Sequence, residues 1–252
     1  RISLAYVIMI ILIWIPMARR KSLAFLDVGQ GDCFVADTKS GAIIFDGGSS
    51  SEDQVGRYRI LPYMKYLGYQ KIQIAVISHM DIDHYSGIKE LLEMGKIKYL
   101  GLPEIPKDET MKKIIGIAKK RGTTIFYLSR GRQITTKDGS LKVLHPQKNS
   151  QMEKNAASLV MQGKILGYRV LLTGDVEKEG EEELLSEELE RADILKAAHH
   201  GSKNSTSNEF LQKVQPKQTV ISCGKQNRYG HPHLETIHRL QTYRTKIYRT
   251  DR

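Results

Sequence analysis

The alternation of apolar and polar positions predicts a mixed α/β chain. Short apolar runs bounded by glycine or aspartate are typical of buried strands, and apolar positions spaced by three and four residues indicate helices. These rules predict strands over residues 23–28, 33–36, 42–45, 72–77, 97–102, 123–128, 141–145, 159–162, 169–172, 193–198, 219–224 and 246–249. They predict helices over residues 55–67, 88–94, 108–120, 176–190 and 234–242, with Asp108 as a cap for the third and a solvated acidic face on the fourth.

The first residues have a different pattern. Residues 2–18 carry no charge and are followed directly by the basic residues 19–21. Seventeen residues at the helical rise of about 1.5 Å extend for about 25 Å, close to the thickness of a bilayer core. We therefore expect a transmembrane helix and its basic flank over residues 1–21 and a folded domain over residues 22–252. A signal peptide and a buried helix are the alternatives. Since the chain begins with Arg1, we expect further sequence before it.

Composition adds a preference for anionic partners. The 252 residues are 40% hydrophobic, enough for a sizeable core, and carry a formal net charge of +11. Such a charge favours nucleic acid, anionic lipid or phosphorylated substrates, although a merely soluble basic protein has it too. Cys33 and Cys223 are too few for a disulfide framework and are predicted to be buried free thiols.

Side chains that can bind a metal ion gather after strand 72–77. His79, Asp81, Asp83 and His84 lie between that strand and the next helix, where ligands bind in open α/β sheets. Two imidazoles and two carboxylates that converge there would repel and lose solvation without a cation among them. An exposed polar turn is the alternative, but the H-x-D-x-D-H pattern favours a metal site.

Polar residues also follow three other strands, so we expect one shared site at one sheet edge. Two metal ions need about six to eight ligands. The predicted metal ligands are His79, Asp81, Asp83, His84, Asp175 and His231, with His200 as the alternative to His231. The predicted catalytic residues are Asp83, which is placed to move a proton, His199 and His200. The predicted substrate-binding residues are Ser202, Lys203, Asn155, Ser158, Asn227 and Arg228. The choices between His199 and His200, and between His231 and His233, stay open.

Six segments resemble the motifs of the metallo-β-lactamase fold and, more narrowly, of the C-terminal domain of ComEC-like competence proteins. They are LDVGQGD (26–32), FDGG (45–48), SHMDIDHYSG (78–87), LLTGD (171–175), KAAHHGSKNST (196–206) and ISCGKQNRYGHPH (221–233). The resemblance covers the chain from about residue 23 to its end. It implies a four-layer αβ/βα sandwich with a dinuclear site on one edge.

Two departures from the usual family pattern affect the metal preference. Asp81 replaces the second histidine of the first loop, as is usual in the ComEC-like branch. The histidine of the third motif is absent, and Asn155 and Ser158 stand in that region. Both changes exchange nitrogen donors for oxygen, which favours manganese or magnesium over zinc.

The resemblance implies a metal-dependent nuclease that degrades one strand during DNA uptake. Its expected cofactors are two divalent ions, manganese or zinc with magnesium possible. Its expected partners are DNA and the membrane, with the domain on the extracytoplasmic face of the cell membrane; residues 19–21 alone would place it in the cytoplasm. The alternatives are a lactone, ester or thioester hydrolase of the same fold and a non-catalytic DNA-guiding module.

Overall fold

The computed structural model describes residue 6, residues 21–152 and residues 155–252. The membrane helix expected over residues 1–21 lies outside these residues except at its last position and Tyr6. Within the described part of the chain, no helix combines the length and apolar character needed to cross a membrane. The two-part division of the chain therefore stays a prediction.

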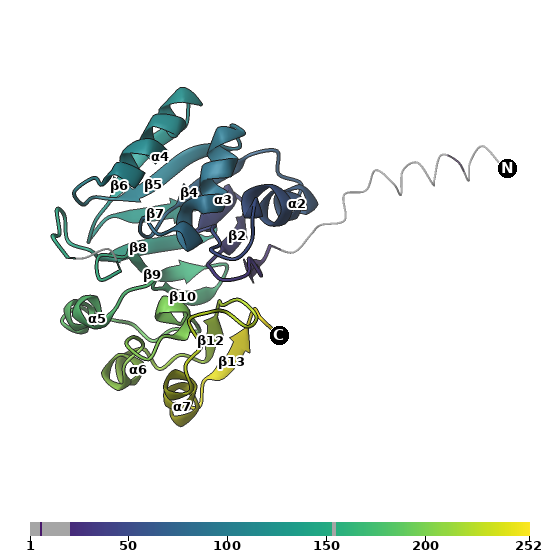
Figure 1. Ribbon diagram of the computed structural model, residues 1–252. Coiled ribbons are helices and arrows are strands. Elements are labelled where there is room, and N and C mark those ends of the chain that lie inside the picture. Colours follow the sequence, from purple (N-terminus) through teal and green to yellow (C-terminus); the bar gives the residue numbers. More distant parts are fainter. Residues whose placement is uncertain (1–5, 7–20, 153–154) are drawn as a thin grey trace.

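Two mixed sheets lie face to face between two layers of helices (Figure 1). The first sheet runs antiparallel across its first three strands and parallel thereafter. In order its strands are β1 (Leu23–Phe25), β2 (Phe34–Thr38), β3 (Gly41–Phe45), β4 (Ile72–Val76), β5 (Ile97–Pro103) and β6 (Thr124–Leu128). The second sheet has the spatial order β13 (Lys246–Arg249), β12 (Gln218–Ile221), β11 (Ile194–Lys196), β10 (Tyr168–Leu172), β9 (Val160–Ile165), β8 (Gly139–His145) and β7 (Gln133–Thr136).

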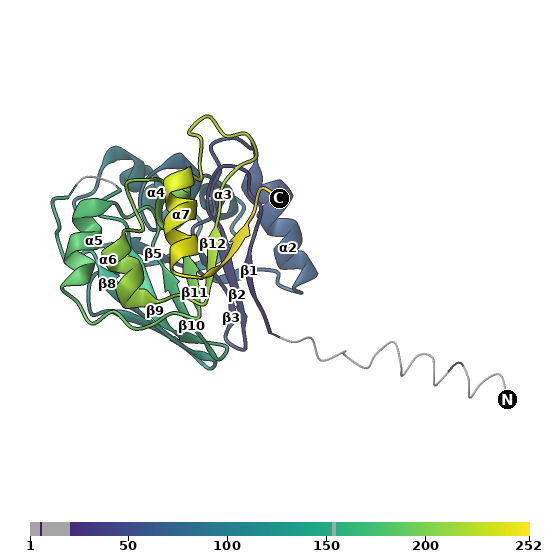
Figure 2. The same ribbon diagram turned by 90° about the horizontal axis from the view of Figure 1, so that it is seen from below.

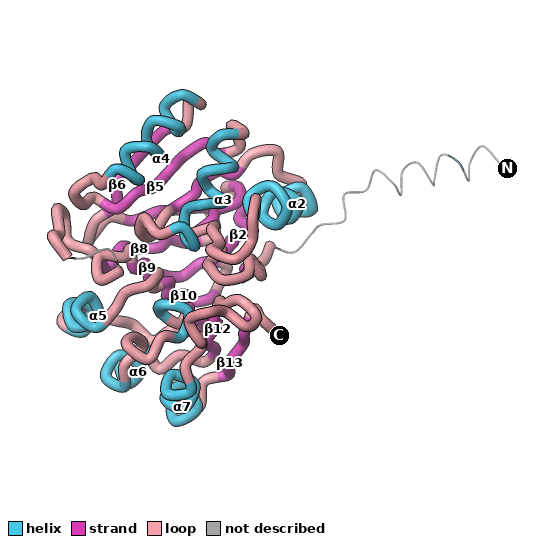
Figure 3. The backbone as a smooth tube through the Cα atoms, in the orientation of Figure 1, coloured by secondary structure: helices cyan, strands magenta, loops and turns pink. Residues whose placement is uncertain are grey.

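The helices divide between the two outer faces (Figures 2 and 3). The first sheet is covered by the π-helical turn η1 (Gly56–Ile60), α2 (Leu61–Tyr66), α3 (Ile82–Glu93) and α4 (Glu109–Lys120). The second is covered by α5 (Lys178–Leu185), α6 (Asn208–Val214) and α7 (Leu234–Thr242), and the short 3-10 turn η2 (Ala198–Gly201) follows β11. This arrangement confirms the mixed α/β fold with two sheets.

Strands buried on both faces explain why the sequence shows continuous apolar runs. In β3, Ile43 and Phe45 belong to the core between the sheets, whereas Ala42 and Ile44 pack in the core beneath the helices. Successive strand residues point to opposite faces, so a strand between two layers is apolar at nearly every position.

The structure corrects several predicted elements. The sequence patterns missed β7, where Ile134 alone is buried, and α6, which is only seven residues long. The strand predicted over residues 159–162 extends to Ile165 as β9 and so includes Gly163. The acidic helix is shorter than predicted, and its Glu181 is buried because it accepts the backbone N–H groups of Thr206 and Ser207.

Two local predictions are confirmed. Asp108 caps α4 because its side chain accepts the backbone N–H of Met111 at 2.7 Å. Cys33 and Cys223 are buried free thiols.

Candidate metal centre

The strand ends of both sheets carry the candidate ligands to one place. Asp46 follows β3, the segment His79–His84 follows β4 and begins α3, and Asp175 follows β10. His200 lies in the η2 turn after β11, and His231 lies in the loop after β12. These elements are far apart in the sequence, so only the packing of the two sheets brings the side chains together.

Asp175 is the centre of the cluster. Its Oδ2 lies 3.2 Å from Nε2 of His84 and 3.2 Å from Nε2 of His200. His79, His84 and Asp175 form one group whose ligand atoms all lie within 4.8 Å of one another. Asp83, His84 and His200 form a second such group. The two groups share His84, and a third group, Asp32, Asp175 and His200, shares Asp175 with the first. One imidazole nitrogen binds a single ion, whereas a carboxylate can bridge two, so Asp175 is the residue that two ions side by side could share.

Three imidazoles are oriented by partners outside this cluster. The contacts are His84 Nδ1 to Asp46 Oδ2 at 3.0 Å, His200 Nδ1 to the Ser222 carbonyl oxygen at 2.9 Å, and His79 Nδ1 to Ser78 Oγ at 3.0 Å. Such partners fix the ring orientation of metal-binding histidines and leave Nε2 as the ligand atom. Each ring therefore presents Nε2 to the centre.

The hydrogen bonding of the histidine Nε2 atoms indicates whether these residues fit a metal ion. The Nε2 atoms of His79, His84 and His200 are buried, and among the described residues none makes a well-directed hydrogen bond; those of His84 and His200 face the Asp175 carboxylate at 3.2 Å. Buried polar atoms are rarely left unpaired, because the lost solvation costs about 1–3 kcal/mol each. Coordination of a cation satisfies all three, so the donor set fits divalent ions.

A buried lysine completes the charge pattern of the site. Lys196 Nζ lies 3.2 Å from Asp175 Oδ1, 2.7 Å from the Gly174 carbonyl oxygen, and in contact with Asp32 Oδ2. Burial alone would lower the pKa of Lys196, but the two carboxylates outweigh burial and hold its pKa above the ordinary value. Lys196 is therefore a fixed positive charge between two acidic side chains.

The acidic residues stay ionised despite their burial. Burial would raise the pKa of Asp175, but His200, His84 and Lys196 hold it well below its usual range. The pKa of Asp32 falls to about 2, since Lys196 and His200 outweigh the burial that would raise it. A buried centre with several ionised carboxylates attracts cations strongly.

Asp32, Asp46 and Lys196 were absent from the predicted site. Asp32 Oδ1 lies 3.3 Å from His200 Nδ1, and Asp46 binds the ring of His84. The glycine-aspartate turns at the ends of the first and third predicted strands were the available signal for both carboxylates. Lys196 had no such signal, because it lies inside the predicted strand 193–198.

His200, and not His199, lies inside the cluster. His200 is buried, whereas the side chain of His199 is 23% exposed and its Nδ1 lies 2.8 Å from Glu177 Oε1. Both histidines have left-handed backbones, with φ of 47° and 52°. Non-glycine residues adopt this conformation at a cost, and it commonly marks functional sites.

His231 and Asp81 lie at the edge of the cluster. The buried Nδ1 of His231 has no hydrogen-bond partner in the described ranges, whereas Nδ1 of His233 accepts the backbone N–H of Lys203. Burial and then His200 and His199 lower the pKa of His231 to about 4, so its ring is neutral at neutral pH. The Asp81 carboxylate is 38% exposed and its Oδ2 lies 3.7 Å from His79 Nε2.

Three predicted substrate-binding residues serve the architecture of the site. Ser158 is buried, and its Oγ accepts the backbone N–H of Asp175. Ser202 is buried directly after η2, and its backbone N–H donates to the His199 carbonyl oxygen. The Asn227 side chain folds its own loop, since its Nδ2 donates to the carbonyl oxygens of Gly224 and His231.

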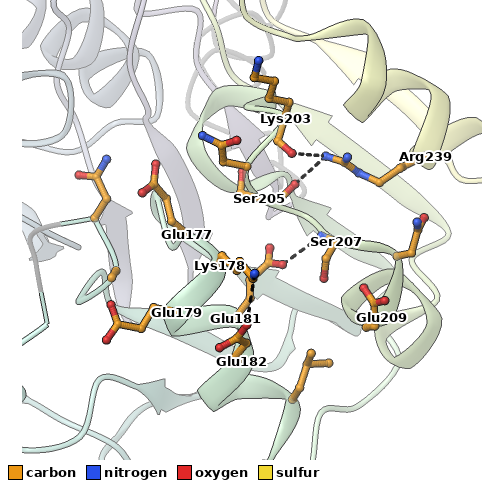
Figure 4. A pocket seen from close by; sticks show the side chains of 15 residues that line it. Glu177, Lys178, Glu179, Glu181, Glu182, Lys203, Ser205, Ser207, Glu209 and Arg239 are labelled. Carbon is orange, nitrogen blue, oxygen red and sulfur yellow. Dashed lines mark hydrogen bonds and ion pairs between the residues drawn. The ribbon is translucent and has the colours of Figure 1, made fainter.

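Asn155 and Lys203 line a cavity of about 1450 Å³ beside the centre (Figure 4). Its walls come from α5, α6 and the loop before α6, and Glu177, the partner of His199, lies on its rim. Most charged side chains in its lining are acidic: Glu177, Glu179, Glu181, Glu182 and Glu209. The sixth predicted residue, Arg228, is exposed on the loop after β12.

The fold and this site define a class of protein. Residues 26–225 match the profile of the metallo-beta-lactamase superfamily, and the chain belongs to that family. It is similar to "ComE operon protein 3" of Bacillus subtilis, with 35% identity over 97% of this chain and 34% of the relative. "Competence protein ComA" of Neisseria gonorrhoeae is 29% identical over 89% of this chain and 30% of the relative. The chain thus spans about a third of the length of these relatives.

A solved structure supports the fold. The metallo-beta-lactamase fold protein YhfI from Bacillus subtilis superposes with a TM-score of 0.61, at 12% identity, over 91% of this chain and 97% of that protein. At this identity the likeness establishes the fold alone.

Proposed function

We propose that this chain is a metal-dependent hydrolase that cleaves phosphodiester bonds of DNA during DNA uptake at the cell membrane. The observation that carries the proposal is the convergence of the His79, His84 and His200 imidazoles on the Asp175 carboxylate. The net charge of +11 and the competence-protein relatives favour DNA as the substrate.

The residues divide naturally between two ion positions. His79, Asp81 and His84 would hold one ion, and Asp83 and His200 the other, with the Asp175 carboxylate within reach of both. Manganese or zinc would fill these positions, with magnesium as a further candidate, because the donors combine imidazoles with several carboxylates. Ions bound there would supply positive charge to a phosphate and lower the pKa of water.

Two side chains are placed to move protons. The Asp83 carboxylate is 15% exposed and its pKa is lowered, because His200 and His84 outweigh the effect of burial. It can therefore accept a proton from an attacking water at neutral pH. His199, whose Nδ1 lies 2.8 Å from Glu177 Oε1, would donate a proton to the leaving oxygen.

DNA digestion assays with defined metal ions test the proposal. Purified protein is stripped with a chelator, reloaded with manganese, zinc or magnesium, and incubated with single-stranded and duplex DNA. We expect ion-dependent DNA cleavage that Asp83→Asn and Asp175→Asn reduce at least about 100-fold. Glu93→Gln is the matched control, since it removes one carboxylate charge from the exposed far end of the same helix that carries Asp83.

Three results would reject the proposal. Cleavage that Asp83→Asn leaves unchanged would mean that the nuclease is a contaminant. Hydrolysis of lactones or thioesters without cleavage of DNA would assign the site to small esters. Salt-sensitive DNA binding without turnover under any ion would indicate a DNA-guiding module.

A further inference from the structure

A ladder of planar groups leads from the metal centre to solvent. The ring of His231 stacks on that of buried His200, with centroids 6.2 Å apart and planes at 29°. The ring of Tyr229 stacks on His231 at 5.7 Å and 21°. The Cζ of Arg228 lies 4.8 Å from the Tyr229 centroid. The ladder therefore runs outward from His200, in the centre where a scissile phosphate would bind, to the exposed Tyr229 and Arg228.

The loop holds this exposed end in a fixed orientation. Arg228 Nη2 donates a hydrogen bond to Tyr229 Oη at 2.6 Å, and Asn227 Oδ1 accepts the backbone N–H groups of Tyr229 and His231. Tyr229 nevertheless remains 43% exposed. An aromatic ring that is oriented in advance but left open to solvent is suited to contact a planar ligand.

The loop of residues 224–233 and the cavity differ in the charge of their side chains. The loop of residues 224–233 carries Lys225 and Arg228 and no carboxylate. The cavity has five glutamates in its lining, and its Arg239 is already bonded to the carbonyl oxygens of Thr206, Lys203 and Ser205 (Figure 4). A phosphate chain is therefore favoured along the loop and repelled from the cavity.

We propose that Arg228 and Tyr229 form a stacking platform for an unpaired nucleobase beside the scissile phosphate, so that the substrate is a single-stranded polynucleotide. This inference rests on the proposed function and narrows its substrate class. Bases in a duplex are paired and stacked on one another, whereas an unpaired base can place its face on the platform. Because every base has such a face, the platform selects strandedness and not sequence.

Binding of a fluorescent strand tests the platform without turnover. The probe is a single strand of about ten nucleotides that contains 2-aminopurine, mixed with the full chain in a chelator. We expect Tyr229→Ala to weaken binding about tenfold and to abolish the quenching that stacking causes. Tyr229→Phe keeps the ring and should keep both. Tyr168→Ala is the matched control, because Tyr168 is 51% exposed at the opposite end of β10 from Asp175.

A strand with abasic sites separates stacking from backbone contacts. Wild type should bind it about tenfold more weakly than the intact strand, and Tyr229→Ala should cause no further loss. Equal affinity of wild type and Tyr229→Ala for the intact strand would overturn the platform, as would a loss that persists on the abasic strand. If wild type cleaves no DNA with any ion, the proposed function fails, while these binding measurements still judge the platform.

Discussion

The ammonium of Lys196 lies 3.2 Å from the carboxylate of Asp175, the residue on which the candidate ligands converge. The same ammonium contacts Asp32, and all three side chains are buried. Lys196 is thus a permanent positive charge within the site. Its ammonium contacts Oδ1 of Asp175, whereas Oδ2 of Asp175 faces the imidazoles of His84 and His200. Lys196 therefore positions Asp175 for binding an ion.

Removal of this lysine should destabilise the ion-free protein strongly. Lys196→Met leaves two buried carboxylates without their counter-charge, which costs about 3–5 kcal/mol in the free energy of unfolding. A divalent ion should restore part of the loss, because it supplies positive charge to the same carboxylates. Urea unfolding with a chelator and with manganese measures both effects.

Lys217→Met is the control for this substitution. Lys217 also pairs with an aspartate, but its side chain is 71% exposed, so the change should cost less than about 1 kcal/mol. Equal losses for the two variants would show that the burial of Lys196 has no bearing on stability.

Loss of the partner of His84 should weaken ion binding without unfolding the chain. In Asp46→Asn the side-chain oxygen can still accept the backbone N–H of Ser78, which the native Oδ1 binds at 2.7 Å. The charged acceptor for His84 Nδ1 is lost, and such changes reduce metal affinity about 10- to 100-fold. Competition with a chromophoric chelator gives the affinity. An unchanged affinity together with an unchanged melting temperature would contradict a role for Asp46 in orienting His84.

The sequence predicted the parts of the fold that local patterns determine. Strands such as β4 and β10 end in buried apolar runs, Ala75–Val76 and Val170–Leu172, so they could be recognised singly. The edge strand β7 could not, since its neighbours leave most of its residues in solvent and Ile134 alone is buried. The seven residues of α6 are too few to show a clear helical period.

The candidate site shows the same division. The H-x-D-x-D-H segment has several ligands on one turn, so it could be recognised without the structure. Lys196 ends β11 in the second sheet, and Asp32 lies in the loop between β1 and β2 of the first, so their contact exists only once the two sheets pack. Likewise, nothing local distinguishes His200 from His199, since both have left-handed backbones; only the packed structure shows that the His200 ring is buried and that His199 is 23% exposed.

Stability should depend on pH through Asp193. The backbone N–H of Arg169, then its guanidinium and Lys217, bind this carboxylate and hold its pKa below the ordinary value. A depressed pKa in the folded state means that the stabilisation is complete above the unfolded pKa near 3.8 and is lost as the pH falls towards the folded value.

Asp193→Asn measures this contribution. Its unfolding free energy should lie about 1 kcal/mol below wild type at neutral pH, and the difference should shrink below pH ~4. Urea titrations of both proteins across this range give the comparison. A difference that stays constant down to pH ~2 would mean that the loss is not electrostatic.

Close backbone packing at Gly48 should couple stability to the site. A Cβ added to Gly48 would lie 2.6 Å from the backbone of Ile82, Asp83 and His84, in the first turn of α3. Gly48→Ala must therefore displace the turn that carries Asp83 and His84, at about 1–3 kcal/mol of stability and with a loss of ion affinity. Gly116→Ala in α4 is the control, since a Cβ there would have no heavy atom within 4 Å, and it should stabilise by up to about 1 kcal/mol. Thermal unfolding and chelator competition on both variants separate the outcomes. A stable Gly48→Ala protein with native ion affinity would show that the contact does not position α3.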